Sequence, residues 1–225
     1  MRRLVKLLVP FVVVVAGSGF AAWYFLFKTD PAPRAKIKET ATVAAPGAAL
    51  DGTYSVKPGN TDNFVGYRVT EKLVASIFAN TATGRTDSVT GTLTITGNTV
   101  SNVTVTADLR SLTSDQGGRD GTIQNEGLES NRFPQAKFVL TQPITLAAVP
   151  AVGQTITTHA TGNFTLHGVT KKVTFDVVAK RVTGAIRING SIPVTFADYN
   201  INNPSGGPAS VGNSGTMEFT LVLTR

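Results

Sequence analysis

The chain of 225 residues is long enough for one domain with appendages. It is rich in Thr, Val and Gly, which favours an all-β body, and its lack of Cys excludes disulfides, thiolate metal sites and cysteine nucleophiles. The formal net charge of +7 is concentrated at the N-terminus, where residues 1–50 carry seven Lys or Arg and two acids. Anionic lipid head groups are the natural partner of that segment, whereas the nearly neutral remainder, without a basic stripe, argues against nucleic-acid binding.

The first feature along the chain is an uncharged, largely apolar run over residues 7–27. At about 1.5 Å per residue it spans roughly 30 Å, the thickness of a bilayer core, and Trp23 near its distal end suits an aromatic belt. The alternative is a cleaved signal peptide, with residues 7–17 as its apolar region and 19–21 as its cleavage site. Cleavage there would expose the apolar sequence WYFLF at the new terminus, so an uncleaved signal anchor or transmembrane helix over residues 1–28 is favoured.

The next stretch, residues 29–50, is rich in Ala, Thr and Pro and has almost no large apolar side chains. This composition predicts a flexible linker that spaces the body away from the membrane surface. From Asp51 the pattern changes to short alternating runs separated by turns, and it continues to the C-terminus. We therefore expect one domain over residues 51–225.

Ten stretches of this domain have the period-2 alternation and turn punctuation of antiparallel strands. They are residues 52–57, 63–72, 74–80, 88–96, 99–109, 136–140, 155–166, 171–183, 185–196 and 216–224. Residues 111–132 interrupt the pattern, with one short helix expected over 119–126, and residues 200–215 are expected to form a loop. Many sequential hairpins with one apolar face predict an up-and-down barrel or a sandwich.

The clearest hairpin covers residues 161–176, TGNFTLHGVTKKVTFD, where two strand-like runs flank a break at His167-Gly168. This segment, as FTLHGVTKKVTF, resembles the signature hairpin of the YceI-like, polyisoprenoid-binding proteins. Further segments match the same family in order over residues 51–225. They are G-x-Y-x-V at 52–56, VGYRV at 65–69, SLTS at 111–114, Arg119-Asp120, and RFPQAKF at 132–138.

The resemblance implies a lipocalin-like antiparallel β-barrel whose interior tunnel takes a long isoprenoid chain. It also implies an extracytoplasmic body in the cell envelope or periplasm. With the anchor, the protein would be a single-pass cell-membrane protein whose N-terminus is cytoplasmic. The chain departs from the family pattern in carrying an anchor and linker, and in having Gly121 and Thr122 where bulkier residues commonly follow Arg-Asp.

Strand parity indicates which side chains face the interior, independently of the family. A barrel of about eight strands has an interior just wide enough for side chains or for one slender ligand. The predicted lumen residues are Tyr67, Val69, Leu93, Phe164, Leu166, Phe175, Val177, Ile188, Phe196 and Phe219. Alternatively, these side chains simply fill a solid core.

Four polar residues are expected at the rim or lid of the barrel. Arg119 and Asp120 would contact a head group or form an ion pair or cap at a short helix, Arg132 would tie a loop to the rim, and His167 would form a structural hydrogen bond in its turn. His159 lies eight residues before His167 on one predicted strand, roughly 26 Å away at about 3.3 Å per residue, so the two cannot share a metal ion. No catalytic or metal-binding residue is indicated.

Two functions follow from these expectations. The first is a membrane-anchored, non-enzymatic protein that holds an isoprenoid quinone or polyprenyl chain in its lumen for carriage or sequestration. The second is a structural or interaction module of the cell envelope with a solid barrel. An enzyme is a distant third, and no cofactor is expected apart from a bound isoprenoid lipid.

Overall fold

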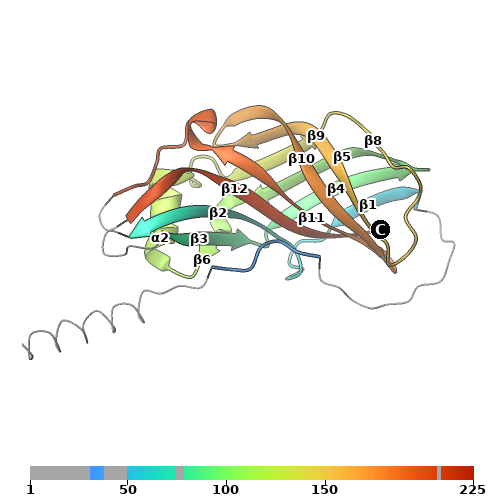
Figure 1. Cartoon of the computed structure of the whole chain (residues 1–225), viewed down its shortest axis with the longest axis horizontal. Coiled ribbons are helices and arrows are strands. Elements are labelled where there is room, and N and C mark those ends of the chain that lie inside the picture. Colours follow the sequence, from blue (N-terminus) through green and yellow to red (C-terminus); the bar gives the residue numbers. More distant parts are fainter. Residues whose placement is uncertain (1–30, 38–49, 74–78, 207–208) are drawn as a thin grey trace, which may run out of the picture. The chain divides into compact units, whose positions relative to one another are not determined.

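A computed structural model of the chain describes residues 31–37, 50–73, 79–206 and 209–225. Within them, twelve antiparallel strands and four short helical segments form the body shown in Figure 1. The strands are β1 (Gly52–Val56), β2 (Phe64–Leu73), β3 (Ala79–Thr86), β4 (Val89–Thr96), β5 (Thr99–Asp108), β6 (Thr113–Ser114), β7 (Gln135–Leu140), β8 (Ile144–Thr145), β9 (Thr155–Leu166), β10 (Val169–Val182), β11 (Ala185–Thr195) and β12 (Ala209–Thr224). The helical segments are η1 (Leu109–Ser111), α2 (Gly117–Thr122), η2 (Ile123–Gly127) and η3 (Phe196–Tyr199).

Eight of these strands form a closed ring in the order β1-β4-β5-β7-β9-β10-β11-β12, which the pairing of β12 with β1 completes. The predicted antiparallel barrel with one short helix is therefore confirmed. The predicted up-and-down order is correct from β4 to β12 but wrong at β2. Instead of pairing with β1, β2 pairs with the first part of the 16-residue β12, and β3 and β6 extend the sheet from there.

The β9–β10 hairpin matches the prediction closely. Its register pairs Leu166 with Val169, so His167 and Gly168 form a two-residue turn, and both have positive φ, 51° and 74°. Two successive positive φ values are typical of a type I′ turn, whose twist matches that of the flanking strands. The turn thus fixes the register that brings Phe175 opposite Ala160 on the inner wall.

Two predicted boundaries are wrong. The strand expected over residues 74–80 is β3, which begins at Ala79 and ends at Thr86; residues 74–78 lie outside the described residues. The small side chains of ANTATGRT hide its alternation. The predicted loop over 200–215 contains the first part of β12, where a register shift between Val211 and Gly215 allows this Gly- and Asn-containing stretch to pair with β2.

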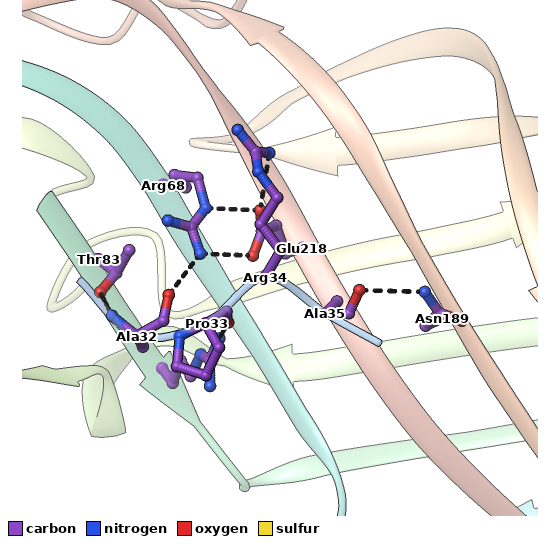
Figure 2. Close-up of polar contacts among 9 residues, drawn as sticks. Ala32, Pro33, Arg34, Ala35, Arg68, Thr83, Asn189 and Glu218 are labelled. Carbon is purple, nitrogen blue, oxygen red and sulfur yellow. Dashed lines mark hydrogen bonds and ion pairs between the residues drawn. The ribbon is translucent and has the colours of Figure 1, made fainter. Parts of the chain in front are cut away.

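Residues 32–35, which belong to the predicted linker, lie across the outer face of the barrel (Figure 2). The Arg68 guanidinium donates to the Ala32 carbonyl at 2.6 Å, Asn189 Nδ2 donates to the Ala35 carbonyl at 3.2 Å, and Arg85 donates to the Pro33 carbonyl. We call this segment the strap. It contacts side chains of β2, β3 and β11, and it belongs to the same compact unit, residues 32–225, as the barrel.

The strap covers an ion pair between neighbouring strands. Arg68 Nε on β2 donates to Glu218 Oε1 on β12 at 2.7 Å, and the two side chains are only 10% and 5% exposed. Arg34 of the strap adds a longer contact to the same carboxylate, at 3.4 Å (Figure 2). In the part of the chain that the structure describes, no helix is long and apolar enough to cross a membrane. The predicted span over residues 7–27 lies outside that part.

Candidate functional site

A first cavity of about 150 Å³ lies inside the barrel and is lined almost entirely by apolar side chains. Because successive residues of a strand face opposite sides, alternate residues of β5, β9, β10, β11 and β12 supply most of this lining. Its members include Val65, Leu93, Ile95, Val105, Phe138, Leu140, Ile156, Thr158, Ala160, Phe164, Phe175, Val177, Ala179, Arg181, Ile186, Ile188, Ile192, Met217, Phe219 and Leu221.

A second cavity of about 270 Å³ has a more polar lining and is bordered by α2 and η2. Its lining includes Tyr67, Val69, Glu71, Ala82, Gln116, Arg119, Thr122, Ile123, Leu128, Leu166, Val194, Phe196, Ile201, Val211 and Met217.

The two cavities lie end to end along the barrel. On β2, Val65 lines the first cavity, whereas Tyr67 and Glu71, further along the strand, line the second. The strands β9, β11 and β12, which also line both cavities, show the same order; on β11, for example, Ile192 lines the first cavity and Val194 the second. Met217 lines both, so the cavities meet at its side chain. Figure 1 shows α2 at one end of the barrel and β8 at the other.

Glycines on the barrel wall make room for aromatic rings that line the cavities. A Cβ atom added at any of three glycines would overlap an aromatic ring carried by a neighbouring strand. Each ring therefore packs directly on backbone, which a larger residue at the glycine would prevent. The pairs are Gly84 with Tyr67, Gly162 with Phe138, and Gly190 with Phe219.

All ten predicted lumen residues line one of the two cavities; that they contact a lipid stays a prediction. Those lining the first cavity are Leu93, Phe164, Phe175, Val177, Ile188 and Phe219. Those lining the second are Tyr67, Val69, Leu166 and Phe196.

The second cavity is lined by an ion pair between Arg119 of α2 and Glu71 of β2. Arg119 Nη2 lies 2.7 Å from Glu71 Oε1, and the side chains are 11% and 10% exposed. Burial alone would lower the pKa of the Arg119 guanidinium, but the carboxylates of Glu71 and Asp115 outweigh it and raise that pKa. The pair ties the helical segment to the sheet.

The other predicted rim residues have structural contacts. Asp120 Oδ1 accepts a hydrogen bond from the Ser114 amide at 2.9 Å. Arg132 is exposed and lies 3.8 Å from the Glu129 carboxylate. Asp120 thus holds the turn before α2 together, and neither Asp120 nor Arg132 lines either cavity.

His167 is buried in the hairpin turn, as expected for a structural role. Its Nδ1 donates to the Tyr199 carbonyl at 3.0 Å, and its Nε2 lies 2.7 Å from Glu129 Oε2. His159 instead is exposed and pairs with Asp176 at 2.6 Å. Among the described residues, no group of three or more His, Asp or Glu side chains could hold a metal ion.

Sequence reasoning missed several polar residues of the cavities, among them Glu71, Arg181 and Gln116. Glu71 has the same strand parity as Tyr67 and Val69, so parity alone could have placed it inside. Arg181 lines the first cavity and donates to the Pro150 carbonyl at 2.9 Å, and it has the parity of Val177. Gln116, just before α2, gave no comparable signal because it lies outside the strands.

Comparison with protein families gives one match that covers most of the chain. A family model described as the YceI-like domain matches residues 54–223. Curated relatives include UPF0312 proteins of Pseudomonas savastanoi pv. phaseolicola and Pseudomonas syringae pv. syringae, each 35% identical over 117 residues. The matches cover 49% of this chain and 56% of each relative, so the chain spans about half the length of the curated relatives it matches.

Solved structures show the same fold. A polyisoprenoid binding domain from Saccharophagus degradans, implicated in plant cell wall breakdown, is 19% identical with a TM-score of 0.58, over 76% of this chain and 97% of that domain. BcnA from Burkholderia cenocepacia is 15% identical with a TM-score of 0.53, over 71% of this chain and 94% of BcnA. At such identities the likeness establishes the fold alone.

Proposed function

We propose that this chain, which belongs to the YceI-like family, holds the chain of one isoprenoid quinone or polyprenyl lipid in its barrel for carriage or sequestration. The apolar lining of the first cavity is the observation that carries the proposal. Burying apolar ligand surface there is favourable by about 25 cal/mol per Å², and the cavity offers almost no polar group to oppose it.

The dimensions of the cavities favour a long ligand that occupies both. An apolar cavity of about 150 Å³ holds a molecule as small as benzene, so the first cavity alone does not suit a long chain. Together, the two cavities fall within the roughly 300–1,000 Å³ typical of ligand pockets. Their end-to-end order along the strands suits one extended chain. The Saccharophagus degradans domain of the same fold, described as polyisoprenoid binding, adds support.

The cellular setting that we propose rests on the sequence. The uncharged run over residues 7–27 has the length of a bilayer span, and we infer that it anchors the chain with its N-terminus in the cytoplasm and its barrel in the cell envelope. A lipid carrier at that position would draw its ligand from the adjacent bilayer. Protease added to cells stripped of their outer layers should then release the barrel, whereas a barrel protected until lysis would reverse the orientation.

A larger side chain in the first cavity tests whether the lumen holds a lipid. Val177 lines the first cavity, and Val178, the next residue on β10, faces the outside. In Val177→Trp the indole would occupy ligand space, so we expect the lipid recovered per protein, measured by mass spectrometry of an organic extract, to fall at least tenfold. Val178→Trp is the matched control and should retain its lipid.

Thermal unfolding of the lipid-free variants separates this function from a solid barrel. In a packed core, added volume typically costs about 1–3 kcal/mol, whereas an open lumen accepts the ring with little loss. Stability retained with lipid lost in Val177→Trp supports the carrier. Strong destabilisation of that variant, together with no prenyl lipid in the wild-type extract, would instead favour a structural or interaction module.

A further inference from the structure

The second cavity differs from the first in the charges at its wall. Arg119 of α2 and Glu71 of β2 line it with opposite charges, and the carboxylate of Asp115, in the turn before α2, also lies next to Arg119. Arg119 forms ion pairs with Glu71 and Asp115. Arg68, the other cation of the described lining, is paired with Glu218 on the outer face. Every cation at this cavity is therefore already neutralised.

Uncharged hydrogen-bonding groups are nevertheless present. The Gln116 side-chain amide lines the cavity and has no hydrogen-bond partner among the described residues, so it can donate to one ligand atom and accept from another. Tyr67 also lines the cavity, and burial raises the pKa of its phenol, which keeps that group neutral. Its Oη is enclosed and has no hydrogen-bond partner among the described residues.

We propose that the Glu71–Arg119 pair makes the second cavity selective for lipids with an uncharged polar head, such as an isoprenoid quinone or a free prenyl alcohol, over prenyl phosphates. The inference rests on the proposed function, because it assumes that the isoprenoid chain runs through both cavities, with its head at the α2 end of the second. A phosphate or diphosphate head would meet carboxylates and no available cation. A binding site can reject a competitor by leaving the competitor's charge without a partner, because a buried charge without a partner is costly.

Glu71 is the residue that sets this selectivity. Its carboxylate holds Arg119 at 2.7 Å from the sheet side, and both side chains are about nine-tenths buried. Removing the charge in Glu71→Gln leaves Arg119 with Asp115, whose side chain is 36% exposed. The guanidinium then becomes available to a phosphate, which it binds well because its planar fork matches phosphate oxygens.

The experiment is a competition between three lipids with the same prenyl tail, a quinone, an alcohol and a diphosphate. The full chain is loaded in phosphatidylcholine nanodiscs containing equal amounts of each, and the bound species are counted by native mass spectrometry. For the wild type we expect each uncharged lipid to exceed the diphosphate at least tenfold. In Glu71→Gln the ratio should shift toward the diphosphate at least tenfold, and Glu71→Gln with Asp115→Asn should shift it further.

The matched control is Glu126→Gln. Glu126 has the same side chain as Glu71 and lies in η2, which directly follows the helix α2 that carries Arg119. It is exposed, however, and does not line the cavity. The ratio of uncharged lipid to diphosphate bound by Glu126→Gln should equal that of the wild type. A changed ratio in this control would mean that net charge alone causes the effect, and it would overturn the role of Glu71. An unchanged ratio in a Glu71→Gln variant that unfolds normally would do the same.

The remaining outcomes separate this inference from the proposed function. If the wild type binds the diphosphate as well as the alcohol, head-group selectivity fails while lipid binding stands. If Arg181→Ala then removes that diphosphate binding, the head lies at the opposite end of the lumen, where Arg181 lines the first cavity. If none of the three lipids binds, the proposed function itself fails. If Glu71→Gln does not fold, the ratio of uncharged lipid to diphosphate in the wild type and in Asp115→Asn still tests the selectivity.

Discussion

Gly84 on β3 lies directly opposite Tyr67 on β2, and the phenol ring packs over it against the wall of the second cavity. All three of the nearest atoms that a Cβ at Gly84 would meet belong to the Tyr67 side chain. Gly162 and Gly190 differ, because a Cβ there would also approach the backbone carbonyls of Val139 and Asp176. Of these three glycines, Gly84 is therefore the one at which an added methyl group would displace only an aromatic ring, that of Tyr67.

We predict that Gly84→Ala displaces the Tyr67 ring from the wall and narrows the second cavity. The free energy of unfolding of the lipid-free protein should fall by about 1–3 kcal/mol, the usual cost of overpacking, and lipid recovery should fall as well. Urea unfolding measures the free energy of unfolding, and mass spectrometry of an organic extract measures the lipid recovery. Adding Tyr67→Leu should restore stability, with a coupling energy of roughly 0.5–3 kcal/mol.

Gly121→Ala is the control for this prediction, because a Cβ there meets no atom within 4 Å and the residue lies in α2. Ala in place of a helical Gly is neutral or stabilising by up to about 1 kcal/mol. Equal losses in Gly84→Ala and Gly121→Ala would mean that the ring and the glycine are not specifically matched.

The strap is the element that was least visible in the sequence. Three of its hydrogen bonds are accepted by the main-chain carbonyls of Ala32, Pro33 and Ala35. Because every residue has such a carbonyl, the side-chain pattern does not predict these bonds. The composition of residues 29–50 therefore predicts a linker, although four of these residues lie against the barrel. Of the side chains that bind the strap, Arg68 on β2 and Asn189 on β11 are on the outer face of strands whose alternation is clear in the sequence, whereas Arg85 is on β3, whose alternation is hidden.

We predict that the buried pair beneath the strap holds it in place. Glu218→Ala leaves the Arg68 guanidinium without its carboxylate, and breaking a buried pair in this way costs about 3–5 kcal/mol. We expect the lower end of that range, because water can reach Arg68 once the strap lifts. Hydrogen exchange should show faster exchange of the Ala32 amide, which donates to Thr83 Oγ1 at 3.2 Å.

Arg34→Ala is the comparison for the strap. The Arg34 side chain is 69% exposed, and its contact with Glu218 spans 3.4 Å, so its removal should change stability by about 0–1 kcal/mol. If both variants lose stability equally, or if the exchange of Ala32 is unchanged in Glu218→Ala, the strap does not depend on the Arg68–Glu218 pair.

At the scale of the whole molecule, the barrel and its inner face follow from local patterns. The β9–β10 hairpin is specified by strict alternation and a His-Gly turn, and ten lumen residues were placed by parity alone. The position of β2 beside β12 could not be predicted, because pairing between residues more than 100 positions apart leaves no local trace. The ion pair between Glu71 and Arg119 could not be predicted either, because it joins residues 48 positions apart that lie in different elements.

The last prediction concerns the stability of the whole barrel. A lipid that binds only the folded chain stabilises it by about 2.7 kcal/mol when its free concentration is a hundred times Kd. For a domain of this size each kcal/mol raises Tm by about 2–4 °C, so delipidated full-length protein in nanodiscs should gain about 5–11 °C as prenyl alcohol is added. Val177→Trp, whose indole fills the first cavity, should show no such gain, whereas Val178→Trp should match the wild type. A Tm independent of prenyl alcohol in the wild type would mean that the lumen takes no lipid and that its side chains form a solid core.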